Sequence, residues 1–258
     1  MTQTNDNEHK QDFHVMCACL PSSLDDVHNN MAVMESAFPQ AKESQADLLM
    51  FGEAFLQGFE AMTFDYKNDV QKAIFLKGVE ITTIRTWAKK HDLAIGFGFF
   101  ENQAGGIYSS YLVIDREGDV QGHYRRVSKG WKQSHACADY REGNQFTTFT
   151  LDGRSFTILL CGDFWEDDLL LPIIDRDEMT DYYLWPVHCD YPTEEWNRVS
   201  HEVYRQRTEI LAKPVIFVNN FIEEEGRAKG GAYLWRQGKE LTGLAYGEPG
   251  MLVVNLEG

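Results

Sequence analysis

FTILLCGDFWED, at residues 156–167, constrains the fold more than any other part of the chain. Its first residues form an apolar run, which is typical of a strand buried on both faces. The run ends on Cys161, and Gly162 and Asp163 follow directly. A thiol at a strand end beside a glycine can face a cleft with backbone N–H groups nearby, where an oxyanion would be stabilised. The stretch therefore predicts a sheet protein with Cys161 as a candidate nucleophile.

LLMFGE, at residues 48–53, has the same construction and ends on Glu53. Functional side chains gather where parallel strands end, so Glu53 and Cys161 can converge at one edge of a sheet. A carboxylate in a mostly apolar pocket suits proton exchange with a thiol. Taken separately, the two residues could equally be a solvated loop glutamate and a small buried cysteine.

The remaining pattern alternates strands with helical stretches. We predict further strands at residues 13–20, 93–100, 107–115, 120–125, 146–151, 155–161, 182–185, 214–219, 232–235 and 251–256. A helix capped by Ser23 ends or kinks at Pro39, and a second helix runs over 70–90. A third, over 194–213, is amphipathic, and its predicted buried side carries Trp196, Val199, Val203, Ile210 and Leu211. This order predicts an α/β sheet fold in one domain over 13–258, after a flexible tail at 1–12.

Composition excludes several classes of protein. Of the 258 residues, 43% are hydrophobic and 25% charged, as in an ordinary globular protein. The net charge of −16 repels phosphate backbones and argues against nucleic acid as a partner. No apolar run approaches the roughly 18 residues that span a membrane, and no signal-peptide core follows the N-terminus, so we expect a cytoplasmic protein without a membrane partner.

The cysteines and acidic residues show no pattern typical of a metal site. Five cysteines, an odd number without a C-x-x-C pair, indicate neither a disulfide framework nor structural zinc. An acidic group follows Cys161, and we interpret it as a solvated helix start; it comprises Asp163, Glu166, Asp167 and Asp168. We therefore expect neither a metal nor another cofactor.

Three blocks, LLMFGE, GHYRRV at 122–127 and ILLCGDFWED at 158–167, occur in the order found in the carbon–nitrogen hydrolase, or nitrilase, superfamily, and resemble its blocks. The family's blocks usually read as a strand ending in Pro-Glu, then Tyr-Arg-Lys, then Cys-x-Asp. Further segments resemble the family between and after these blocks: 93–126, 141–149, 203–220 and 230–241. The resemblance covers residues 13 to 256 and implies an α-β-β-α sandwich of two packed sheets flanked by helices.

The resemblance also implies a Glu–Lys–Cys triad. Carried over by position, Cys161 is the nucleophile and Glu53 the general base, but Arg126 stands where the family has lysine. Arginine keeps its positive charge at ordinary pH, whereas its planar fork differs from an ammonium. Lys129 or Lys132, just downstream, are the alternative cations, and Lys129 is slightly favoured.

A further glutamate often lies between the family's lysine and cysteine and orients the attacked group. Glu142 is the only glutamate in that interval, and Asp139 is a second possibility. Trp165, Tyr191 and Trp196 could line a substrate pocket, although aromatic residues there are more often core or subunit interface. We include Glu142 and Trp165 as candidate substrate-binding residues.

The function that the resemblance implies is hydrolysis of a non-peptide carbon–nitrogen bond in a small molecule. The substrate would be an amide, a carbamoyl compound or a nitrile, with amide favoured, and the reaction would pass through a thioester on Cys161. The alternative is a catalytically silent ligand-binding member of the same fold, which the arginine at position 126 motivates. Family members commonly pair through a helical face, so a homodimer or larger homo-oligomer is expected.

Overall fold

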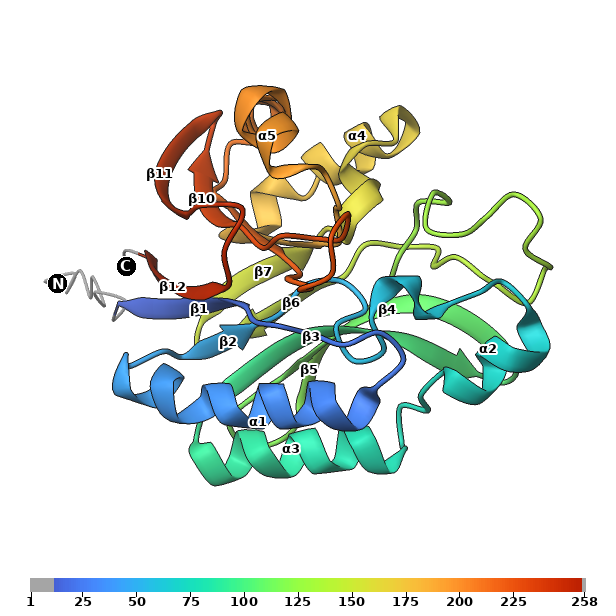
Figure 1. The fold of residues 1–258 in the computed structure, drawn as a ribbon. Helices are drawn as coiled ribbons and strands as arrows, with labels where there is room; N and C mark the ends of the chain where they lie inside the picture. The colour runs from blue at the N-terminus through green and yellow to red at the C-terminus, as the bar shows by residue number, and fades with distance from the viewer. Residues whose placement is uncertain (1–11, 257–258) are drawn as a thin grey trace, which may run out of the picture.

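Two six-stranded sheets form the centre of the computed structural model, which describes residues 12–256 (Figure 1). The first has the order β12-β1-β2-β3-β4-β5 and the second β11-β10-β9-β8-β7-β6. The first sheet contains β1 (Phe13–Cys19), β2 (Leu48–Met50), β3 (Ala94–Gln103), β4 (Gly106–Ile114), β5 (Val120–Arg125) and β12 (Gly250–Leu256). The second contains β6 (Thr148–Leu151), β7 (Arg154–Ile158), β8 (Tyr182–Val187), β9 (Val215–Asn219), β10 (Ala232–Arg236) and β11 (Lys239–Leu244).

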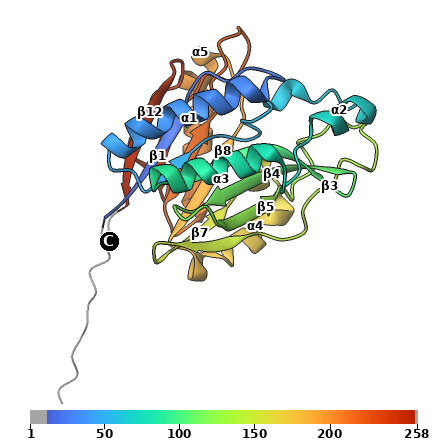
Figure 2. The same cartoon turned by 90° about the horizontal axis from the view of Figure 1, so that it is seen from below.

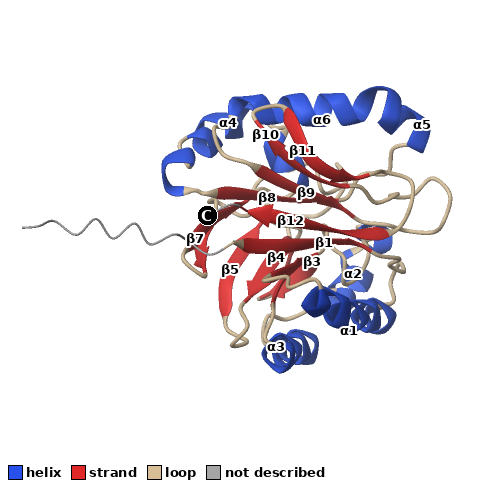
Figure 3. Ribbon diagram, turned by 90° about the vertical axis from the view of Figure 1, so that its left-hand side faces the viewer, coloured by secondary structure: helices blue, strands red, loops and turns tan. Residues whose placement is uncertain are grey.

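Helices cover the outer face of each sheet. The helices are α1 (Val27–Glu43), α2 (Tyr66–Lys72), α3 (Val79–His91), α4 (Asp167–Ile174), α5 (Thr193–Glu195) and α6 (His201–Arg207). Figures 2 and 3 show α1 and α3 against the first sheet, and Figure 3 shows α4, α5 and α6 over the second. The predicted α-β-β-α sandwich is confirmed.

The central strands, such as β1, β2, β8 and β9, are buried on both faces because each sheet lies between another sheet and a helix layer. In β1, Val15 and Cys17 pack into the core between the sheets, while Met16 and Ala18 pack under the helices. All four are buried. A continuous apolar run, rather than strict alternation, is the pattern such strands require.

The first helix begins later than predicted and does not end at Pro39. Its N-cap is Asp26, whose side chain accepts from the backbone N–H of Asn29 at 2.9 Å, and not Ser23. Pro39 lies inside α1, which continues to Glu43. Burial of apolar side chains such as Phe38 offsets the free-energy cost of the backbone hydrogen bond that Pro39 cannot make.

The helix predicted over 70–90 is two helices, α2 and α3. Ile74, between them, donates its N–H to the carbonyl of Phe100 at 2.8 Å and accepts from the N–H of Asn102 at 2.9 Å. Pairing with the end of β3 therefore overrides the helical pattern at this point.

The predicted buried side of the late helix is partly wrong. Trp196 is buried, but Val199, Val203 and Ile210 are 47%, 46% and 39% exposed. The segment Trp196–Ser200 forms a π-helical turn, which inserts an extra residue and rotates the helix face.

The sequence predicts a flexible N-terminal tail and no membrane-spanning segment. The flexible tail at 1–12 lies, apart from its last residue, outside the described residues. None of the helices described between residues 12 and 256 has the length and the apolar composition of a membrane-spanning segment.

Glu101, at the end of β3, is a fully buried carboxylate. It accepts hydrogen bonds from Arg125 Nε and Nη2 at 2.9 and 2.6 Å and from Ser110 Oγ at 2.8 Å, and His123 Nε2 lies at 2.9 Å. Burial alone would raise the pKa of Glu101, but the bonds from Arg125 and His123 lower it to about 2. The carboxylate thus joins β3, β4 and β5 at the edge of the first sheet.

We predict that Glu101→Gln lowers the free energy of unfolding by about 2 kcal/mol near neutral pH. The folded pKa of Glu101 lies below the unfolded value of about 4.3, so its stabilisation is complete above that value and is lost as pH falls toward about 2. Urea unfolding at neutral and acidic pH should show a difference that shrinks in acid. Exposed Glu117→Gln is the control, and equal stability of the Glu101 and Glu117 variants would contradict the prediction.

Candidate active site

Five strands, β2, β5, β7, β8 and β9, end at the same edge of the sandwich, and a polar or reactive residue lies just beyond each. The strands β1, β2 and β3 are parallel, β5 runs parallel to β3 through the antiparallel β4, and β7, β8 and β9 are parallel. The residues beyond these ends are Glu53, Arg126, Cys161, His188 and Asn220. Carboxyl ends of parallel strands commonly carry functional groups, and hydrogen bonds link these residues as described below.

Glu53 is fully buried, and its backbone is held on both sides. Its N–H donates to the carbonyl of Val187 at 3.1 Å, and its carbonyl accepts from Asn220 Nδ2 at 2.5 Å. Carboxylate Oε1 accepts from Ser109 Oγ at 2.8 Å and from Arg126 Nη1 at 2.9 Å. Oε2 is buried without a hydrogen-bond partner in the described residues. One oxygen of Glu53 is thus occupied, and the other is free to take a proton.

Arg126 is 4% exposed, and each arm of its guanidinium has a separate environment. Nη1 donates to Glu53, and Nε donates to Ser128 Oγ at 2.7 Å. Nη2 lies beside Gly162, where an added Cβ would come within 2.1 Å of it. Gly162 therefore leaves the space in which the guanidinium reaches the turn that carries Cys161.

Cys161 begins a 3₁₀ turn, Cys161–Phe164, three residues beyond the end of β7. The prediction that the strand itself reaches Cys161 is therefore wrong. Cys161 has φ +48°, a left-handed conformation that is strained for a residue with a side chain and recurs at functional sites. Trp185 Nε1 donates to its carbonyl at 2.9 Å, and Sγ donates to the carbonyl of His188 at 3.6 Å.

The Cys161 thiol holds its proton in this environment. Burial raises its pKa, the negative charge of Glu53 raises it further, and the positive charge of Arg126 only partly opposes them, leaving a pKa of about 12. A thiol in this state becomes a nucleophile only when a base removes its proton.

Asp163 is fully buried, so the interpretation of the acidic group as solvated is wrong for this residue. Its Oδ1 accepts from the N–H groups of Val127 and Ser128 at 3.1 and 2.8 Å. Its Oδ2 accepts from the Leu160 N–H at 2.8 Å and from the phenolic OH of Tyr124 at 2.6 Å. The carboxylate joins the loop after β5 to the loop after β7. It thereby holds Arg126 next to Cys161, and its position two residues after the cysteine was the available sequence signal.

The alternative cations lie elsewhere. Lys129 is exposed, and within residues 12–256 its ammonium forms no ion pair. Lys132 pairs with Glu142 at 2.5 Å and donates to the carbonyl of Tyr140 at 2.7 Å. The structure thus brings Arg126, and neither lysine, into contact with Glu53.

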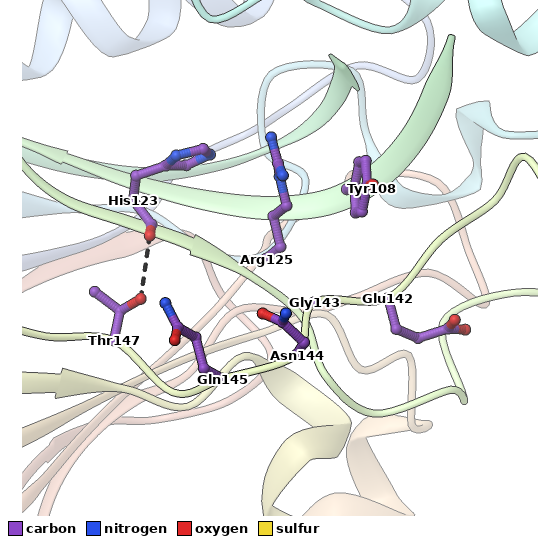
Figure 4. A pocket seen from close by; sticks show the side chains of 8 residues that line it. All are labelled: Tyr108, His123, Arg125, Glu142, Gly143, Asn144, Gln145 and Thr147. Carbon is purple, nitrogen blue, oxygen red and sulfur yellow. Dashed lines mark hydrogen bonds between the residues drawn. The ribbon is translucent and has the colours of Figure 1, made fainter. Parts of the chain in front are cut away.

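The two candidate substrate-binding residues line other hollows. Glu142 borders a pocket of about 290 Å³ with Tyr108, His123 and Arg125, and Figure 4 shows its side chain directed away from His123 and Arg125. Trp165 packs edge-on against Tyr204 at a ring separation of 4.8 Å and borders a surface hollow on the outer helix layer. Asp139, the second possibility to Glu142, is bound to Arg141 at 3.3 Å.

The arrangement combines a protonated thiol, a carboxylate oxygen without a partner and a fixed positive charge. Such a set can carry out nucleophilic addition to a polarised carbon with proton transfer. Sequence reasoning did not find the supporting roles of Ser109, His188 and Asn220, because contacts between distant strand ends leave no local pattern.

A family model described as carbon–nitrogen hydrolase matches residues 17–247. An (R)-stereoselective amidase of Pseudomonas sp. is 30% identical over 117 residues, which cover 45% of this chain and 40% of the relative. A probable nitrilase of Schizosaccharomyces pombe is 25% identical over 157 residues, covering 58% of this chain and 55% of the relative. The matched region thus spans about half the length of these relatives.

Among solved structures, an amidase from Nesterenkonia sp. has a similar fold. It is 18% identical to this chain, with a TM-score of 0.77 over 95% of this chain and 90% of that one. In a mutant of that amidase, acrylamide has added to the active-site cysteine by Michael addition. At this identity, the similarity establishes the shared fold.

We predict that Gly162→Ala displaces the Arg126 guanidinium and lowers the free energy of unfolding by about 1–3 kcal/mol, the usual effect of overpacking. Gly130→Ala is a matched control, because its Cβ would lie 3.7 Å from the same nitrogen, an ordinary contact. We expect the control to change stability by less than about 0.5 kcal/mol in urea unfolding. Equal effects of the two substitutions would show that the space beside Gly162 is not required.

Proposed function

The chain belongs to the carbon–nitrogen hydrolase family, and we propose that it hydrolyses a non-peptide carbon–nitrogen bond of a small molecule, with Cys161 as nucleophile and Glu53 as general base. The observation that carries the proposal is the unpartnered Oε2 of Glu53, whose carboxylate is close enough to raise the pKa of the Cys161 thiol. The substrate class that we favour is an amide, and carbamoyl compounds and nitriles are the alternative classes. The acrylamide adduct on the cysteine of the Nesterenkonia amidase supports an amide-sized ligand.

In the first half of the proposed reaction on an amide, Glu53 takes the thiol proton as Sγ adds to the carbonyl carbon. The C=O electron pair moves to oxygen, and the oxyanion faces the Arg126 guanidinium and backbone N–H groups near Gly162. When the carbon–nitrogen bond breaks, protonated Glu53 gives its proton to the departing nitrogen. A thioester on Cys161 and a free amine or ammonia result.

In the second half, water attacks the thioester carbon and Glu53 takes a proton from that water. Collapse of the tetrahedral intermediate breaks the carbon–sulfur bond, and Glu53 returns the proton to Cys161. The product is a carboxylic acid, and the resting thiol and carboxylate are restored.

Arg126 has a different role from Glu53 and Cys161, which exchange protons during the proposed reaction. Its guanidinium stays protonated, since burial lowers its pKa but the charges of Glu53 and Cys161 raise it above the ordinary value. It therefore offers charge and hydrogen bonds without donating a proton. We propose that it takes the place that lysine has in the family pattern.

The test uses Cys161→Ala and Glu53→Gln with a panel of small amides, carbamoyl compounds and nitriles. We expect Cys161→Ala to abolish hydrolysis and Glu53→Gln to lower kcat/KM by about 10²- to 10⁴-fold. Iodoacetamide labelling of Cys161 in Glu53→Gln should instead become severalfold faster near neutral pH, because the pKa of the thiol falls once the Glu53 charge is absent. Exposed Cys137 is the internal reference for labelling.

Glu101→Gln is the matched control, because Glu101 is also a buried carboxylate bound by an arginine. It should leave both hydrolysis and labelling of Cys161 unchanged. If no compound of the panel is hydrolysed and labelling of Cys161 does not respond to Glu53→Gln, the silent ligand-binding alternative replaces this proposal.

We also propose a homodimer formed through the outer helix layer of the second sheet. Val199 and Val203 are about half exposed there, and Leu171 on α4 is 73% exposed. The valines border a hollow with Trp165 and Tyr191. Apolar side chains exposed on one face are typical of a protein–protein interface.

We expect sedimentation velocity to show a dimer for the natural chain and a monomer for Val199→Glu with Val203→Glu. Val120→Glu, at an exposed valine on β5, should remain dimeric. A monomeric natural chain, or a dimer that survives the double substitution, would contradict the proposed interface.

A further inference from the structure

His188 contacts two residues of the candidate site, Cys161 and Asn220. Its backbone carbonyl accepts from Cys161 Sγ at 3.6 Å. Its ring, 4% exposed, lies flat on Phe59 at a ring separation of 4.9 Å. The ring nitrogens make two polar contacts, one toward Asn220 and one toward Glu60.

The hydrogen bonds of Asn220 determine which nitrogen of the His188 ring carries the proton. The carbonyl of Glu53 can only accept, so the amide group of Asn220 that faces it at 2.5 Å must be Nδ2. The same Nδ2 lies 3.1 Å from His188 Nδ1 and directs its second hydrogen there. We therefore assign Nδ1 as an unprotonated acceptor and place the ring proton on Nε2.

The opposite nitrogen has a partner suited to this tautomer. His188 Nε2 lies 3.0 Å from Glu60 Oε1, which also accepts from Arg227 Nη1 at 3.2 Å. The carboxylate thus holds the Nε2 proton, and Arg227 balances its charge. A continuous series of contacts runs from Arg227 through Glu60, His188 and Asn220 to the backbone of Glu53.

We propose that His188 is a positioning residue, which fixes Glu53 in front of Cys161 by holding Asn220 through Nδ1. This inference rests on the proposed function. Asn220 cannot be held equally well with its amide reversed, because its Oδ1 would then face the Glu53 carbonyl oxygen. Without an acceptor at the Nδ1 position, Asn220 and the residue that it holds lose their fixed orientation.

The test compares His188→Asn with His188→Gln. Asparagine can place its amide oxygen near the position of Nδ1 and keep an acceptor for Asn220. Glutamine can place its amide nitrogen near Nε2 and keep a donor for Glu60, but it has no acceptor at the Nδ1 position. Both variants lose the stacking on Phe59, and asparagine is smaller than glutamine by one methylene group, so lost packing alone would harm His188→Asn at least as much as His188→Gln.

We expect His188→Asn to keep kcat within about threefold of the natural chain and His188→Gln to lose about 10- to 100-fold in kcat with little change in KM, as misplacement of a catalytic group by about 1 Å does. Similar losses in both variants would overturn the inference and leave the proposed function intact. If the natural chain hydrolyses nothing, the proposed function fails first.

A second measurement decides the tautomer whatever the activity. Long-range ¹H–¹⁵N spectra of the natural chain, with His188 assigned by its absence in His188→Asn, should show a neutral ring protonated at Nε2 near neutral pH. A ring protonated at Nδ1 would overturn the inference, because Asn220 could then not donate to it.

Discussion

The buried ion pair between Glu53 and Arg126 is the constraint around which the rest of the site is arranged. Two opposite charges are removed from water there, which is tolerable only when hydrogen bonds satisfy both groups. Ser109 serves the carboxylate and Ser128 the guanidinium. Removing either charge alone would leave the other uncompensated, at a cost of about 3–5 kcal/mol. Glu53 and Arg126 are therefore tolerated in this buried position only as a pair.

The same pair connects stability with chemistry. Arg126 occupies one oxygen of Glu53 and leaves the other without a partner, so the carboxylate retains a free site for a proton. Asp163 then holds the arginine loop against the turn of Cys161. A lysine at position 126 would carry a compact ammonium, whereas the planar guanidinium of Arg126 donates to Glu53 and Ser128 and also reaches the space beside Gly162. Under the proposed function, Arg126 takes the place of the lysine in the family pattern and contacts more groups than the compact ammonium of a lysine would.

The sequence was informative where burial dictates residue type. Apolar runs ending on Glu53 and Cys161 indicated strands, and the sandwich could be predicted from the resemblance of three blocks. Local pattern failed where distant contacts decide, as at Ile74, which pairs with β3 and breaks a predicted helix. It also failed at Asp163, whose acidic neighbours suggested solvent although its oxygens bind four donors. The choice among Arg126, Lys129 and Lys132 depended on where the loop after β5 runs.

The most direct measurement is kcat/KM of Arg126→Lys and Arg126→Met for the small amide that the natural chain hydrolyses fastest. A fixed positive charge beside Glu53 and Cys161 predicts that Arg126→Lys stays within about tenfold of the natural chain. Arg126→Met should lose about 10²- to 10³-fold, the usual effect of removing one oxyanion donor. Near-UV circular dichroism would establish that both variants are folded. Folded Arg126→Met with the activity of the natural chain would contradict the account.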